Sequence, residues 1–428
     1  MYDIFIYLYL LGVAVASRFS DKVRTMWRGE RDAFGVLQSK VDPSACYVWF
    51  HAASLGEFEQ GRPLIEELRR RRPELKILLT FFSPSGYEVR KNYAGADIVC
   101  YLPIDTPRNA RRFLRMVQPE MAFFIKYEFW YNYLSILHRR GVPTYSVSSI
   151  FRDGQAFFRW YGRQYARVLK CFTHFFVQNE RSRELLASIG LTNATVTGDT
   201  RFDRVLQIRD AARQLPIVEN FVRDCSNVFV AGSSWLPDEE IFIRYFSEHP
   251  DWKLIIAPHV IGEDHLRQIE ALLGDRQVVR YSTADTAQDY SSKGSQTPPS
   301  TLHLPQKELH PQPSVLIIDC FGLLSSIYRY ASVTYVGGGF GVGIHNVLEA
   351  AVWGVPVIFG PNNEKFQEAQ ELKAAGGGFD IQGYDDFARL MDQFLADSQH
   401  LQQAGQQAGA YVGTKAGATG MVLSNIGC

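Results

Sequence analysis

Short apolar runs alternate with amphipathic stretches along most of this chain, and polar or small residues follow each run. In the first half, the runs predict strands at 46–50, 75–82, 98–102, 121–125, 144–147 and 172–177. In the second half, they predict strands at 228–231, 253–257, 315–318, 333–336 and 355–359. Strands that alternate with helices form parallel sheets with helices on both faces. The pattern therefore predicts an α/β protein with two such sheets.

The length of the chain and a lapse in the strand signals suggest where the domains divide. The chain has 428 residues, more than one hydrophobic core usually serves. Strand signals lapse near 200–225, which we interpret as the hinge. We therefore expect an N-terminal segment at 1–20, a first domain at 21–205 and a second domain at 206–428. The polar, proline-rich stretch 282–313 is expected to be an exposed excursion between strands.

The first sixteen residues are apolar apart from Asp3, and basic residues with Trp27 among them follow. The apolar run is shorter than the roughly 20 residues that a spanning helix needs. It has no basic region before it and no convincing cleavage site, which disfavours a signal peptide. The pattern favours a short membrane anchor or interfacial helix, with its basic flank on the cytoplasmic side. A helix packed on its own domain is the alternative.

Charge is distributed unevenly, although the chain as a whole has no net charge. Residues 1–205 hold 30 Lys and Arg against 20 Asp and Glu, and residues 206–428 hold 15 against 25. A basic half suits an anionic membrane surface or an anionic acceptor, with a generic basic surface as the alternative and nucleic acid as the less favoured partner. The six cysteines show no metal-binding spacing, which favours reduced thiols in a cytosolic setting.

Residues 333–361 combine a β-branched strand, a glycine cluster, a predicted helix and a second strand that ends in Gly-Pro. Bare amides at a helix N-terminus bind phosphate, and glycines such as Gly338 and Gly339 allow close approach of the main chain. Asn346 and Glu349 are three residues apart on the predicted helix, where a carboxylate can accept hydrogen bonds from ribose. A dinucleotide site would place an acidic residue where Gly-Pro stands. The stretch therefore predicts a nucleotide-sugar site.

The sequence H-A-A-S-L-G-E at 51–57 follows the first strand and opens a helix predicted over 57–72. Ser54 and Gly56 are suited to the turn. A carboxylate placed like that of Glu57 can take a proton from a sugar hydroxyl as a general base. The spacing of Ser54 and Glu57 is equally typical of a helix capping box, and spacing alone favours that interpretation.

Other polar groups also follow predicted strands, where parallel sheets bind their ligands. Lys126 and Glu128 stand among aromatic residues and suit sugar contacts or a structural ion pair. Ser233 and Ser234 can hold phosphate or cap a helix. Two further candidates are single residues. His259 can donate to a leaving phosphate or serve the structure, and Asp319 can bind a base or sugar or cap a helix. The chain offers no suitable D-x-D pair for a metal ion.

Three motifs, taken in order, resemble those of the 3-deoxy-D-manno-octulosonic acid (Kdo) transferases: H-A-A-S-L-G-E at 51–57, G-D-T-R-F-D at 198–203 and G-I-H-N-V-L-E-A at 343–350. The resemblance implies a GT-B fold, in which two Rossmann-like domains face a central cleft. It also implies inverting, metal-independent transfer of Kdo from CMP-Kdo to a lipid A precursor in lipopolysaccharide core biosynthesis. The implied location is the cytoplasmic face of the inner membrane, and the implied cofactor requirement is none.

The resemblance assigns roles to residues by their match to the family motifs. Glu57 matches the general base. The donor site would include Ser233, Ser234, His259, Gly338, Gly339, Asn346 and Glu349. The acceptor side and cleft would include Ser54, Gly56, Lys126, Glu128 and Asp319. The chain departs from the family pattern in three places: E-T-E-x-W-P-N becomes K-Y-E-F-W-Y-N at 126–132, P-R-H becomes A-P-H at 257–259, and D-T-M-G-E-L becomes D-C-F-G-L-L at 319–324.

Two other interpretations remain open from the residues alone. One is another enzyme of the GT-B fold, either a transferase that uses a UDP-sugar or a UDP-sugar epimerase. The other is a catalytically inactive, membrane-associated protein that binds a nucleotide.

Overall fold

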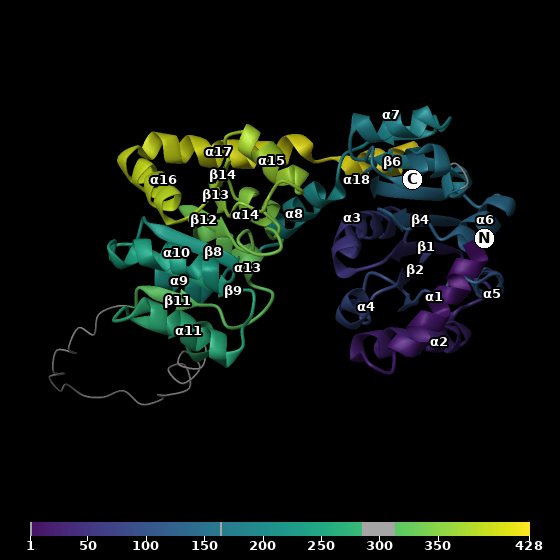
Figure 1. Cartoon of the computed structure of the whole chain (residues 1–428), viewed down its shortest axis with the longest axis horizontal. Coiled ribbons are helices and arrows are strands. Elements are labelled where there is room, and N and C mark those ends of the chain that lie inside the picture. The colour runs from purple at the N-terminus through teal and green to yellow at the C-terminus, as the bar shows by residue number, and fades with distance from the viewer. Residues whose placement is uncertain (1, 163–164, 285–312) are drawn as a thin grey trace, which may run out of the picture. The chain divides into compact units, whose positions relative to one another are not determined.

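The computed structural model describes residues 2–162, 165–284 and 313–428 (Figure 1). The chain divides into two compact units. The N-terminal unit comprises Met1–Arg204 together with Lys415–Cys428, and the C-terminal unit comprises Val205–Thr414. The division differs from the expected one at the end of the chain, because 415–428 packs with the N-terminal unit. Most of the excursion expected at 282–313 lies outside the described residues.

A sheet of seven parallel strands forms the centre of the N-terminal unit, in the order β3-β2-β1-β4-β5-β6-β7. The strands are β1 Tyr47–Ala52, β2 Lys76–Phe81, β3 Ile98–Tyr101, β4 Met121–Ile125, β5 Thr144–Ser149, β6 His174–Val177 and β7 Ala194–Val196. Side chains alternate across β1, so that Trp49 faces one core and Phe50 the other. Strands buried on both faces read as continuous apolar runs, which is why the sequence pattern located most of them.

Helices cover both faces of this sheet (Figure 1). They are α1 Tyr2–Ala16, α2 Asp21–Lys40, α3 Leu55–Arg71, α4 Pro84–Arg90, α5 Pro107–Val117, α6 Tyr131–Arg139, α7 Glu180–Ser188 and α18 Ala418–Asn425, with α8 Thr200–Asp210 at the unit boundary. The last helix, α18, packs against α3 and contributes Val422 and Leu423 to the core beneath Phe50.

The G-D-T-R-F-D motif explains why the end of the chain returns to this unit. The Asp203 carboxylate accepts hydrogen bonds from the backbone N–H groups of Gly417 (2.5 Å) and Thr419 (2.7 Å), at the start of α18. The buried Asp199 accepts from the Gln60 amide at 2.9 Å and from the Arg201 guanidinium at 2.8 Å. Burial alone would raise the pKa of Asp199, but Arg201 and these hydrogen bonds hold it below its ordinary value. The motif therefore fastens α3 and α18 together.

The first helix, α1, packs on its own unit along one face and leaves the other face apolar and exposed. Ile6 and Val13 are buried, and the Tyr2 hydroxyl donates to the Asp105 carboxylate at 2.6 Å. On the opposite face, Ile4, Leu8 and Leu11 are each about 60% exposed. Among the helices that the structure describes, none is both long and apolar enough to cross a membrane.

The C-terminal unit contains a second parallel sheet, in the order β10-β11-β9-β8-β12-β13-β14. Its strands are β8 Val228–Ser234, β9 Lys253–Pro258, β10 Val278–Arg280, β11 Val315–Ile317, β12 Val333–Val336, β13 Val357–Phe359 and β14 Gly378–Asp380. The helices are α9 Pro216–Val222, α10 Leu236–Ser247, α11 Glu263–Leu273, α13 Leu324–Ile327, α14 Leu348–Ala351, α15 Gln367–Ala374, α16 Tyr384–Ala396 and α17 Ser398–Lys415.

The strand order of each sheet reverses at a switch point near the centre of the sheet. In the N-terminal unit this switch point lies between β1 and β4, and in the C-terminal unit it lies between β8 and β12. Loops that leave neighbouring strands at such a point run to opposite faces and leave a crevice over the carboxyl ends of the strands. Each unit therefore has a natural place for a ligand, and most of the candidate residues follow these four strands.

Glu30, in α2, is a buried acid that provides a test of the packing. Its side chain is 3% exposed, and neither carboxyl oxygen has a hydrogen-bond partner within the described residues. Burial raises the pKa of Glu30 to about 8. Because its pKa is higher in the folded protein than in the unfolded chain, the folded protein holds this proton more tightly. The free energy of unfolding therefore falls as pH rises from the unfolded-state pKa through the folded-state pKa.

We expect Glu30→Gln to raise the free energy of unfolding, and to raise it by about 2 to 3 kcal/mol more near pH 7.5 than near pH 5.5. Urea unfolding of both proteins at the two pH values measures this difference. Equal gains at both pH values would show that the carboxyl group of the folded protein is already ionised at pH 5.5, so that its pKa is not raised.

Candidate active site

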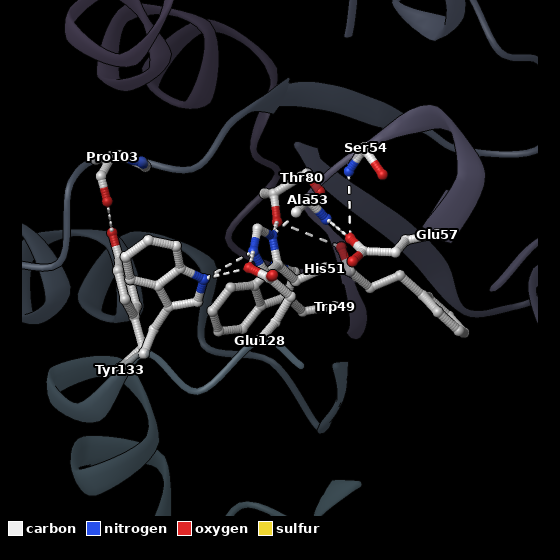
Figure 2. A network of polar contacts seen from close by, with 11 residues as sticks. Trp49, His51, Ala53, Ser54, Glu57, Thr80, Pro103, Glu128 and Tyr133 are labelled. Atoms are coloured by element: carbon white, nitrogen blue, oxygen red, sulfur yellow. Dashed lines mark hydrogen bonds and ion pairs between the residues drawn. The ribbon is translucent and has the colours of Figure 1, made fainter. Parts of the chain in front are cut away.

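Glu57 lies in the first turn of α3, directly after β1, and uses one carboxyl oxygen to hold that turn (Figure 2). Its Oε2 accepts hydrogen bonds from the backbone N–H groups of Ala53 at 2.5 Å and Ser54 at 3.3 Å. Within the described part of the chain, Oε1 makes no hydrogen bond. The cap and the general base were rival interpretations of the sequence, but the geometry accommodates both, since one oxygen caps the helix and the other is available.

A second carboxylate, that of Glu128, lies close enough to influence Glu57. The pKa of Glu57 is raised, first by burial and then by the negative charge of Glu128. The Ala53 N–H group, the charge of Lys126 and the His51 ring when it is protonated act in the opposite direction. A carboxylate with a raised pKa is a stronger base, so this environment favours proton abstraction by Glu57.

A buried polar network fixes the position of Glu128 (Figure 2). Its Oε2 accepts a hydrogen bond from the Trp130 indole at 2.7 Å and lies 3.0 Å from His51 Nε2. The other nitrogen of His51, Nδ1, lies 2.9 Å from the hydroxyl oxygen of Thr80. The Trp49 indole in turn donates to Thr80 at 2.8 Å. With its proton on Nε2, a neutral His51 donates to Glu128 and accepts from Thr80.

His51 was quoted in the sequence motif but given no role, and Thr80 and Trp130 were not singled out. His51 is the fifth residue of β1 and is completely buried. Alternation along the strand places it on the same face as Trp49, and the two rings are 6.4 Å apart between centroids. A histidine at an inward position of a buried strand must have polar partners, and that requirement was the signal available in the sequence.

The remaining acceptor-side candidates fall into two groups. Ser54 is the N-cap of α3, Gly56 lies in the first turn of that helix beside Glu57, and Lys126 belongs to the loop after β4 with Glu128. Lys126 has φ 61°, a conformation that costs a non-glycine residue about 1 to 3 kcal/mol and is concentrated at functional sites. Asp319 belongs instead to the C-terminal unit, where it follows β11 and accepts from the Ser282 backbone N–H at 2.9 Å. Asp319 therefore belongs to a different unit from the other four.

In the C-terminal unit, three aromatic rings stack over the switch point between β8 and β12. His259 follows β9 and is stacked between Trp235 (4.7 Å between ring centroids) and His345 (4.5 Å). The His259 side chain is exposed, and His345 is half-buried. The pKa of His345 is lowered, mainly by burial and also by the neighbouring His259. The hydroxyl of Ser233, whose φ is 52°, stands at the end of β8 without a hydrogen bond within the described residues.

Two of the groups that were expected to contact a phosphate form hydrogen bonds within the protein instead. The fully buried Ser234 hydroxyl donates to Glu239 at 2.8 Å, so it is not available to a ligand. The Gly338 backbone N–H donates to Asp238 at 3.0 Å, and the same carboxylate accepts from the Tyr335 hydroxyl at 2.8 Å. Ser234 and Gly338 therefore shape the glycine loop from within.

The helix expected after the glycine loop is much shorter than its sequence pattern indicates. α14 contains only four residues, Leu348–Ala351, and Asn346 precedes it. The loop folds back before the helix starts, because the His345 N–H donates to the Gly337 carbonyl at 3.1 Å. So short a helix has little dipole to offer a phosphate. Asn346 and Glu349 nevertheless lie together, since the Asn346 amide donates to Glu349 at 3.0 Å.

The glycines of this loop serve close packing. A Cβ atom on Gly339 would come within 2.5 Å of the Cα atom of Gly360, at the end of β13. Gly338 has φ 94°, which a side chain rarely adopts. The loop after β12 therefore lies directly against the loop after β13, an approach that only glycine permits.

Comparison with known structures defines the class of fold. A crystal structure of UDP-GlcNAc 2-epimerase from Neisseria meningitidis superposes with a TM-score of 0.60 at 15% sequence identity, covering 89% of this chain and 99% of that one. At this identity the likeness concerns the fold alone. The protein thus has the two-unit, parallel-sheet architecture of GT-B-like proteins.

The sequence comparisons show which proteins this chain resembles. Residues 28–204 match the family model described as 3-deoxy-D-manno-octulosonic-acid transferase (kdotransferase). The Kdo transferase of Bordetella pertussis is 28% identical over 93% of this chain and 94% of its own length. That of Aquifex aeolicus is 26% identical over 82% of this chain and 86% of its own length. Residues 28–204 thus resemble a domain of the Kdo transferases, and most of the chain is similar to them in sequence.

Proposed function

We propose that this protein is a glycosyltransferase that moves Kdo from CMP-Kdo to a lipid A precursor in lipopolysaccharide biosynthesis, with inversion and without a metal ion. The single observation that carries the proposal is the position of Glu57, at the switch point of a domain that matches the Kdo transferase model. Its carboxylate has a raised pKa and a neighbouring carboxylate fixed by buried groups.

The proposed reaction is a single displacement. Glu57 Oε1 accepts the proton of an acceptor hydroxyl while that oxygen attacks the anomeric carbon of Kdo. The bond from this carbon to the phosphate oxygen breaks on the opposite face, and CMP departs with the electron pair. Attack opposite the leaving group inverts the configuration. Glu57 Oε2 keeps its hydrogen bond from the Ala53 N–H, so that Oε1 keeps its orientation during the transfer.

The donor would bind through groups of the C-terminal unit that are at least partly exposed. We assign the phosphate of CMP to the Ser233 hydroxyl and the His259 ring, and the ribose hydroxyls to the Glu349 carboxylate. An anion beside His259 and His345 would favour protonation of these rings and so offset the charge of the departing phosphate. This role for imidazole is the reason for proposing transfer without a metal.

Two alternatives use the same architecture. A transferase or epimerase that uses a UDP-sugar shares the fold, and an inactive protein would bind a nucleotide without turnover. Incubation with CMP-Kdo or UDP-sugars and a tetra-acylated lipid A precursor, read by mass spectrometry, separates them. We expect a mass increase of one or more Kdo residues with CMP-Kdo alone. Product from a UDP-sugar, or CMP binding without product, would support the respective alternative.

Substitution of Glu57 tests the mechanism. We expect Glu57→Gln to lower transfer at least about a hundredfold, because the amide is not a base. The amide oxygen can still accept from Ala53, so unfolding and CMP binding should change little. Glu88→Gln, a surface carboxylate on α4 paired with Lys91, is the matched control and should retain full activity. Near-normal turnover by Glu57→Gln would remove Glu57 from the reaction.

We further propose that α1 lies in the interface of the cytoplasmic leaflet of the inner membrane and brings the enzyme to its lipid acceptor. Ile4, Leu8, Leu11 and Val15 recur at helical spacing and are each more than half exposed. An apolar stripe of this kind beside a basic unit is typical of helices that lie on anionic membranes. Deleting the helix would also leave Asp105 without its Tyr2 partner, so substitutions give the cleaner test.

We expect Ile4→Ser/Leu8→Ser/Leu11→Ser to reduce sedimentation with vesicles that contain phosphatidylglycerol, because the inserted apolar area is lost. Leu272→Ser/Leu395→Ser removes two exposed leucines of the C-terminal unit and should leave sedimentation unchanged. Urea unfolding of each variant reports on the fold. Undiminished sedimentation of the α1 variant would place the attachment elsewhere.

A further inference from the structure

A cavity of about 360 Å³ opens on the N-terminal unit where α1, α2 and α5 come together. Its wall includes Leu10 of α1, Trp27 and Glu30 of α2, and Arg108 and Arg112 of α5. None of the residues that hold Glu57 or Glu128 lines it. The cavity is therefore a site separate from the candidate active site of the same unit.

Three arginine side chains reach the cavity without a carboxylate partner. Arg31, Arg108 and Arg112 are exposed, and within the described residues none of them forms an ion pair. The Arg112 guanidinium lies 4.1 Å above the centre of the Phe34 ring, which restrains its plane. The fork of N–H donors on a guanidinium matches the oxygens of a phosphate. The cationic rim thus has the chemistry of a phosphate site.

Glu30 is an independent indication that the cavity is built for a ligand. The side chain lines the wall and is only 3% exposed. Within the described residues, neither of its carboxyl oxygens has a hydrogen-bond partner. A buried polar group without a partner costs about 1 to 3 kcal/mol. With its pKa raised to about 8 by burial, the carboxyl is protonated at neutral pH and can donate to a phosphate oxygen. A bound phosphate would supply the missing partner.

The surroundings indicate that the phosphate belongs to a lipid. Leu10 brings α1, the helix that carries the exposed apolar stripe, into the wall of the cavity. α2 packs against both α1 and α5, so the helix with the apolar stripe and the helix with Arg108 and Arg112 have a common neighbour (Figure 1). A molecule with a phosphate headgroup and apolar chains would satisfy both parts at once.

We propose that this cavity binds the phosphate headgroup of a membrane lipid, with Arg108 and Arg112 holding the phosphate and Glu30 donating a hydrogen bond to it. The inference goes beyond the proposed transfer reaction, because it concerns lipid binding in the absence of any sugar donor. It also differs from general attraction to an anionic surface, since it assigns the binding to particular arginines of α5.

Vesicle binding by paired variants tests this distinction. Arg108→Gln/Arg112→Gln removes two charges from the cavity, and Arg111→Gln/Arg115→Gln removes two from the same helix outside it. Binding of the full-length protein to phosphatidylcholine vesicles with phosphatidic acid is measured by flotation. We expect the cavity variant to bind about tenfold or more weakly, because hydrogen bonds to charged groups are lost. The control variant should lose much less.

Equal losses in the two arginine variants would overturn the proposal in favour of general electrostatic attraction. Glycerol phosphate and inorganic phosphate serve as soluble probes of the source of the phosphate. Displacement of the protein from vesicles at concentrations comparable to those of the lipid would show a site for free phosphate and would also overturn it.

Glu30 provides a second measurement. We expect Glu30→Gln to retain most of the binding, because the amide can donate to phosphate, and Glu30→Leu to lose it while its thermal unfolding midpoint is no lower than that of the wild type. Full binding by a folded Glu30→Leu would contradict the role of this side chain.

Discussion

The reversal of strand order in each parallel sheet is the constraint on which the rest of this structure depends. A parallel sheet must be covered on both faces, and its crossover connections leave the crevice over the carboxyl ends open only where neighbouring strands send their loops to opposite sides. In the N-terminal unit that point lies between β1 and β4, and Glu57 and Glu128 follow these two strands. In the C-terminal unit it lies between β8, which ends with Ser233 and Ser234, and β12, which is followed by the glycine loop.

Strand β1 forms part of the core and also influences the pKa of Glu57. β1 is buried along its whole length, so the polar ring of His51 must be satisfied by its neighbours Thr80 and Glu128. That requirement fixes a carboxylate close to Glu57, and the repulsion between the two negative charges adds to burial in raising the pKa of Glu57. Stability and basicity thus arise from one network, in which a structural histidine acts as a positioning residue.

Much of this architecture could be predicted from the sequence, and the failures have physical causes. Long apolar runs marked the buried strands. β7, β10 and β14 were missed because each has three residues that are only partly buried or include polar and small side chains. The tail at 415–428 was assigned to the wrong unit because its attachment depends on Asp203, more than two hundred positions away in sequence. Periodicity does not report such contacts.

The candidate site was likewise only partly predictable from the sequence. Residue type and position after a strand located Glu57, Glu128 and His259. The sequence could not show that Ser234 and Gly338 donate hydrogen bonds to Glu239 and Asp238. Nor could it show that α14 is only four residues long, because both facts depend on how the loops fold back. Burial of Glu30 without a partner was equally invisible, because a lone glutamate in an amphipathic helix resembles any exposed one.

The most direct test of this account is the pH dependence of transfer from CMP-Kdo by the wild-type protein and by Glu128→Gln. The account holds that the charge of Glu128 raises the pKa of Glu57, and that transfer requires Glu57 as the ionised base. Removing that charge lowers the pKa of Glu57 and preserves the ionised form in more acidic solution. The acidic limb of kcat/KM should therefore move to lower pH in the residual activity of Glu128→Gln. An acidic limb that stays in place, or moves to higher pH, would contradict the coupling of the two carboxylates.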